Sequence, residues 1–120
     1  MEKNKIKDFN ERTFEFSIRV IKLFQTLSKT EINLILGKQL LRSATSIGAN
    51  YREANESRTK KDFIHNAIIC KKEAKETKYW LELISEINPT LKGRMEKILL
   101  ETDELIKILS KMILNAETKK

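Results

Sequence analysis

Residues 62–88, DFIHNAIICKKEAKETKYWLELISEIN, decide the fold. Apolar or small residues recur in this stretch at alternating steps of four and three: Phe63, Ala67, Cys70, Ala74, Thr77, Leu81 and Ile84. That spacing places them along one face of an α-helix. The stretch therefore predicts one long helix with an apolar seam of the kind that packs in helical bundles.

Three other segments show the same spacing and predict three more helices. The seam of residues 10–27 consists of Phe16, Val20, Leu23 and Leu27. The seam of residues 32–57 consists of Leu36, Leu40, Ser43, Ile47, Asn50 and Ala54. The seam of residues 91–115 consists of Leu91, Met95, Ile98, Thr102, Leu105, Leu109 and Met112. The sequence thus predicts a single all-α domain over residues 1–120, an antiparallel up-down-up-down four-helix bundle.

Short polar segments separate these helices. Residues 28–31, SKTE, match a capping box with Ser28 as the N-cap of the second helix. Ser57 or Thr59 is the expected N-cap of the third. Pro89 disfavours helix at Asn88 and opens the last element.

The composition excludes several classes of protein. Only three Gly and one Pro occur in 120 residues, which is too little turn chemistry for an all-β sandwich or a Gly-looped nucleotide fold. One cysteine rules out an internal disulfide, and one histidine removes most zinc and haem arrangements. We therefore expect no cofactor and no bound metal.

Charges are spread along the whole chain. The longest stretch without one is residues 43–51, far shorter than the ~20 apolar residues of a membrane span. Residues 1–8, MEKNKIKD, carry charges where a signal peptide has its apolar segment. We expect a cytoplasmic protein without membrane association. The net charge of +7 favours an anionic partner.

Polar residues occupy or flank the predicted seams of the second and third helices. Glu73 and Glu76 are expected to point partly inward and to need donors. The predicted polar network consists of Gln39, Arg42, Ser43, Ser46, Asn50, Glu53, Glu73 and Glu76. Three interpretations remain open: a di-metal site, acid-base catalysis by the glutamates, and a structural network that fixes helix pairing. The third is favoured, because no second histidine and no nucleophile accompany the glutamates.

Two motifs in the central helices resemble a known family. Residues 39–54 match the pattern Q-L-x-R-S-x-x-S-I-x-x-N-x-x-E-A, and residues 72–81 match K-E-A-x-E-T-x-Y-W-L. Both patterns resemble the four-helix bundle proteins named after the intervening sequence of bacterial 23S ribosomal RNA genes. Tyr51-Arg52 departs from the usual pattern and could add to a basic rim.

The resemblance implies an architecture more firmly than an activity. Members of this family form ring-like homopentamers. A related bundle, the accessory protein of diversity-generating retroelements, binds nucleic acid and works with a reverse transcriptase. The resemblance brings no catalytic residues, so we expect no enzyme activity. Apolar sectors wider than one core requires, on the first and last helices, also favour self-association.

Basic residues gather at one end and along one flank of the predicted bundle. We expect nucleic acid to bind through Arg52, Arg58, Lys60, Lys61, Lys71, Lys72, Lys75 and Lys78. The alternative for the lysines is a solvated face paired with Glu82 and Glu86. The sequence thus favours a non-enzymatic, oligomeric nucleic-acid-binding or RNA-associated protein, and the alternative function is a scaffold that binds another protein.

Overall fold

The computed structural model describes the backbone of residues 2–119 and the side chains of residues 9–119. It contains α1 (Glu2–Thr26), α2 (Glu31–Asn55), α3 (Lys60–Ile87), the short 3₁₀ helix η1 (Pro89–Leu91) and α4 (Lys92–Thr118), with no strand in this part of the chain. The prediction of four helices is confirmed. The first begins eight residues before the predicted start, because residues 2–10 contain no Gly or Pro that would end it.

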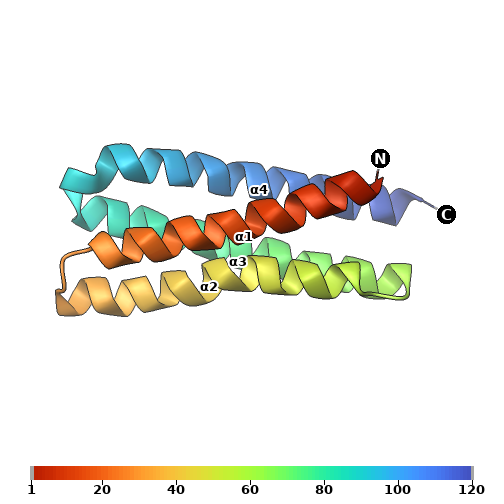
Figure 1. The fold of residues 1–120 in the computed structure, drawn as a ribbon, viewed down its shortest axis with the longest axis horizontal. Helices are drawn as coiled ribbons and strands as arrows, with labels where there is room; N and C mark the ends of the chain where they lie inside the picture. Colours follow the sequence, from red (N-terminus) through yellow and green to blue (C-terminus); the bar gives the residue numbers. More distant parts are fainter. Residues whose placement is uncertain (1, 120) are drawn as a thin grey trace.

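The four α-helices lie along the long axis of an elongated molecule of about 50 × 22 × 20 Å (Figure 1). Turns at alternating ends join α1 to α2, α2 to α3 and α3 to α4, and the start of α1 and the end of α4 lie at the same end of the molecule (Figure 1). The central pair, α2 and α3, makes the most extensive contact, whereas α1 and α4 approach each other only lightly.

Side-chain size explains this asymmetry. The buried face of α3 is made mostly of small residues, including Ala67, Cys70 and Ala74. Larger side chains, such as Phe16 on α1 and Leu105 on α4, fill the space on the other side of the core. Because the distance between helix axes follows the side chains at the contact, α2 and α3 sit close and α1 and α4 stay further apart.

The rotational phase of α2 differs from the prediction. Its fully buried residues are Asn33, Gly37, Leu40, Ser43, Ala44, Ile47, Tyr51 and Ala54. Leu36 and Asn50, predicted for the seam, are only half-buried. Tyr51 is a core residue instead, and its ring packs edge-on against Phe9 with centroids 4.6 Å apart. The helix is turned toward α1 as well as α3 because it must bury a face against both.

Helix starts follow the predicted chemistry with one shift. Thr59 caps α3 by accepting a hydrogen bond from the Asp62 amide at 3.1 Å, as predicted. The predicted cap at Ser28 is wrong: Thr30 caps α2, accepting from the Asn33 amide at 3.1 Å. The backbone oxygen of Ser28 instead accepts from the Asn33 side chain at 2.9 Å. Asn33 also bonds Asn88, which ties the first turn to the third.

Candidate nucleic-acid interface

A pair of hydroxyls lies at the centre of the α2–α3 contact. Ser43 and Thr77 are both fully buried, and Thr77 Oγ1 donates to Ser43 Oγ at 2.8 Å. Ser43 Oγ in turn lies 3.3 Å from the backbone oxygen of Leu40, to which it donates. The two hydroxyls satisfy one another, so a polar contact is buried here without leaving an unpaired group.

Arg42 forms a second cluster nearer the surface. Its guanidinium contacts Glu76 and lies 3.4 Å from Glu73 Oε1, and its Nε donates to Gln39 Oε1 at 3.3 Å. The indole N–H of Trp80 donates to Glu76 Oε2 at 2.9 Å. The side chains of Arg42 and Glu76 are 48% and 38% exposed, so this is a bridge across the α2–α3 rim and not a buried charge.

The remaining members of the predicted network do not join this cluster. Ser46 Oγ donates to the backbone oxygen of Arg42 at 2.7 Å, and Asn50 Nδ2 donates to that of Ser46 at 2.8 Å, so both bond their own helix. Glu53 is exposed and has no side-chain hydrogen bond among the described residues. The sequence interpretation named Ser43 but not its partner Thr77, which it had placed in the apolar seam.

The basic residues of the α2–α3 turn and of α3 lie at the surface. Arg58, Lys60, Lys61, Lys72 and Lys75 are exposed. No ion pair holds any of these five cations within residues 9–119, whose side chains are described. Their charges are therefore free to attract an anion.

Lys78 behaves differently from its neighbours. Its Nζ lies 2.9 Å from Asp103 Oδ1 of α4, and this hydrogen bond raises the pKa of Lys78. Lys71 is half-buried. The alternative, in which the α3 lysines pair with Glu82 and Glu86, is not what forms: in the described part of the chain, the one carboxylate that pairs with an α3 lysine is Asp103. The Lys78 end of the predicted basic flank is thus neutralised by a carboxylate of α4.

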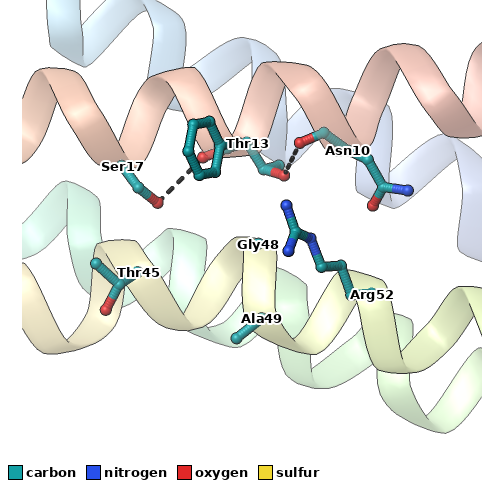
Figure 2. A pocket seen from close by; sticks show the side chains of 8 residues that line it. Asn10, Thr13, Ser17, Thr45, Gly48, Ala49 and Arg52 are labelled. Atoms are coloured by element: carbon teal, nitrogen blue, oxygen red, sulfur yellow. Dashed lines mark hydrogen bonds between the residues drawn. The ribbon is translucent and has the colours of Figure 1, made fainter.

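Arg52 lies apart from the other predicted cations, on the side of α2 that faces α1. Its guanidinium carbon is 5.9 Å from the centre of the Phe14 ring, a distance typical of a cation–π contact. It reaches toward Asn10 and Thr13 over a groove of about 200 Å³ (Figure 2). Gly48 lines this groove, and a Cβ there would lie 3.2 Å from Thr13 Oγ1. Tyr51 is buried, so only Arg52 of that dipeptide is at the surface.

Comparison with known proteins identifies the family. A family model described as 23S rRNA-intervening sequence protein matches residues 7–111. The chain belongs to this family. Among solved structures, it is similar to a crystal structure of a protein of unknown function from the S23 ribosomal protein family of Bacteroides thetaiotaomicron, with a TM-score of 0.80 and 38% identity. That match covers 87% of this chain and 96% of the other. No curated protein matches.

None of the described helices is both long and apolar enough to cross a membrane. Within residues 9–119, no three histidine, cysteine or acidic side chains are placed to share a metal ion. The most prominent polar features of this family member are its exposed cations, the buried hydroxyl pair and the salt-bridged rim of α2 and α3.

Proposed function

We propose that this protein is a non-enzymatic, RNA-associated accessory protein that binds nucleic acid through exposed cations on an oligomeric helical bundle. The observation that carries the proposal is the set of five exposed, unpaired cations at the α2–α3 turn and along α3. The free energy of binding phosphates at these cations is favourable, because the chain has a net charge of +7 and leaves the cations unpaired. The family name, which refers to 23S rRNA, supports the same chemistry.

The bundle is proposed to be an up-down-up-down arrangement that assembles into a cytoplasmic homopentamer. The alternating ends of the turns in Figure 1 support the first part. Large apolar side chains at the surface support the second, including Phe14 on α1 and Leu100 on α4. An assembly of identical subunits repeats every cationic patch by symmetry, which strengthens binding to a long polyanion.

Binding to labelled RNA and DNA tests this function. We expect affinity for single and double strands with little sequence preference, because phosphates carry no sequence information. The logarithm of the binding constant should fall linearly with the logarithm of salt concentration, by ~0.9 per neutralised phosphate on duplex DNA and ~0.7 on single strands. Absence of binding to every strand type at low salt would overturn the proposal.

A protein-binding scaffold is the second candidate. Exposed Ile32, Leu34 and Ile35 in the first turns of α2 favour it, because a partner helix could cover this apolar surface. Purification from the native cell, with and without ribonuclease, separates the two candidates. RNA that copurifies supports the first function. A protein that copurifies after ribonuclease treatment, from a chain that binds no nucleic acid, supports the second.

A further inference from the structure

A second cationic site lies between α1 and α4, away from the α3 lysines. A groove of about 250 Å³ is lined by Arg19, Lys22, Leu23, Arg94, Lys97 and Ile98. The two helices contribute matching five-residue segments, RVIKL at 19–23 and RMEKI at 94–98. In both, an arginine and a lysine three residues later stand on the rim, and the apolar residue that follows is buried.

Four like charges face one another across this groove without compensation. None of the six lining residues is acidic, and none of the four cations has an ion pair among the described side chains. Like charges on the two walls of one groove repel one another, and an anion bound between them relieves this repulsion.

The same two helices show the opposite arrangement elsewhere along their length. Arg12 of α1 donates to Glu101 Oε2 at 3.0 Å and to Glu104 Oε1 at 2.6 Å, both on α4. These hydrogen bonds raise the pKa of Arg12. Charge pairs therefore join α1 to α4 at Glu101 and Glu104. One turn nearer the start of α4, at Lys97, the charged residues that line the groove are all cations. A purely structural contact would be expected to use pairs at both places.

The beginning of α4 adds to the positive potential. The helix starts at Lys92 after Leu91, which gives no side-chain cap, and its first turn has no acidic residue. A helix N-terminus carries a partial positive charge. Arg94 and Lys97 lie in the first two turns, so the helix dipole and the side chains have the same sign at this end of the groove.

We infer that the α1–α4 groove is the primary phosphate-binding site for nucleic acid, with a single strand of the sugar–phosphate backbone as its occupant. The inference rests on the proposed function and places its main contact on α1 and α4, where the sequence analysis had named no cation. Arginine and lysine from both walls bind successive phosphates, and the aliphatic stems of these side chains, which lie over buried Leu23 and Ile98, meet the less polar sugar edge. A groove of about 250 Å³ has room between its walls for one sugar–phosphate strand and not for both strands of a duplex.

Two variants with the same loss of charge test this site. The groove variant carries Arg19→Gln, Lys22→Gln, Arg94→Gln and Lys97→Gln. The matched control removes four of the five α2–α3 and α3 cations named under the proposed function, with Lys60→Gln, Lys61→Gln, Lys72→Gln and Lys75→Gln, so the two variants compare the two cationic surfaces at equal loss of charge. Affinity for a labelled single-stranded RNA is measured over a range of salt concentrations. Inorganic phosphate and a duplex of the same sequence serve as competitors, and thermal unfolding is followed in parallel.

The groove variant should lose at least about tenfold in affinity, and its salt slope should fall by up to about 3, since each phosphate contact on a single strand contributes ~0.7. Its melting temperature should stay the same or rise, because like-charge repulsion is relieved. The control should lose less affinity. If inorganic phosphate displaces the labelled RNA as effectively as an unlabelled strand does, the groove is a free-anion site and the strand assignment is overturned.

The failures of the two proposals are distinguishable. If the wild-type protein binds no nucleic acid, the proposed function fails and the groove site fails with it. If the wild type binds and the control loses as much affinity as the groove variant or more, the function stands and the groove assignment is wrong. If the groove variant melts well below the wild type, the four cations have a structural role, which also contradicts the inference.

Discussion

Arg42 shows how a polar residue at the rim of a bundle can hold two helices together while staying in contact with water. It bridges Glu73 and Glu76 of α3 from the exposed side of α2, and Trp80 adds its indole N–H to Glu76. In a buried ion pair, removing one partner costs ~3–5 kcal/mol of stability, because the other charge is left buried and unpaired. The exposure of this cluster puts its contribution well below that range.

Replacing Glu76 by alanine should therefore lower the free energy of unfolding by about 1–2 kcal/mol, because it removes an ion pair and the acceptor of the Trp80 hydrogen bond. The matched control is Glu82→Ala, which removes an exposed carboxylate of α3 that has no ion pair in the described structure, and it should change stability by about 0.5 kcal/mol or less. Chemical denaturation measures both. Equal losses would show that the cluster does not stabilise the bundle.

Two buried groups that can lose a proton, the Cys70 thiol and the Tyr51 hydroxyl, make the stability of the protein sensitive to alkaline pH. Burial raises the pKa of the Cys70 thiol from 9.0 to about 12. Burial, with a smaller effect of Cys70, raises the pKa of the Tyr51 hydroxyl from 10.0 to about 12. Above pH 9 the unfolded chain releases a proton that the folded chain keeps, so the free energy of unfolding falls as pH rises. Their contribution is complete below pH 9 and is lost between pH 9 and 12.

Cys70→Ala provides the test. Between pH 8 and 10.5 the wild type should lose about 1–2 kcal/mol more stability than the variant, at about 1.4 kcal/mol per pH unit for one group. The alanine variant begins from a lower stability because it leaves a small cavity, so the quantity to compare is the loss between the two pH values. Denaturation midpoints followed by circular dichroism give it. The same loss in both proteins would exclude the thiol as a cause.

At the scale of helices, close approach is decided by residues with little or no side chain. Gly37 of α2 is buried where α1 passes, and a Cβ at this position would overlap the ring of Phe24. Gly93 in the first turn of α4 has open space instead, with no atom within 4 Å of a Cβ.

The two glycines therefore predict opposite effects of the same substitution. Gly37→Ala should destabilise the protein by about 1–2 kcal/mol, since overpacking against Phe24 outweighs the gain in helix propensity. Gly93→Ala should stabilise it by about 0.5 kcal/mol, because propensity is the only term that changes. Thermal unfolding of the two variants measures the difference. A stabilised Gly37→Ala protein would mean that Phe24 moves aside at little cost.

The helices themselves could be predicted because their signals are local. The seam of α3 is buried from Ala67 to Ile84 as its spacing predicts, and Thr59 caps that helix through its own hydroxyl. The rotation of α2 about its own axis could not be predicted in this way, because it depends on how closely α1 approaches at Gly37 and on the room left for Tyr51. The pairing of Lys78 with Asp103 depends likewise on the register between α3 and α4, which single-chain spacing does not give.

At the scale of the whole molecule, the exposed apolar surface is spread more widely than predicted. The sequence analysis expected it on the first and last helices. Leu100 and Leu114 of α4 are indeed 63% and 58% exposed, and Phe14 of α1 is also exposed. Yet α2 exposes Ile32 and Ile35 to a similar degree. A bundle of this size has one core, so side chains turned away from that core on several helices are available to neighbouring subunits.

We predict that the protein forms a stable homo-oligomer, with five subunits as the expected number, and that α4 contributes to the contact. Light scattering coupled to size exclusion should give a multiple of the single-chain mass at micromolar concentration. Leu100→Glu with Leu114→Glu should shift that mass toward one chain, because two charges would be buried without partners in the interface. Lys72→Glu, an exposed change on α3, is the control for added negative charge and should leave the mass unchanged. A wild-type protein that elutes with the mass of one chain would refute self-association. A double variant that stays assembled would instead move the contact to the exposed isoleucines of α2.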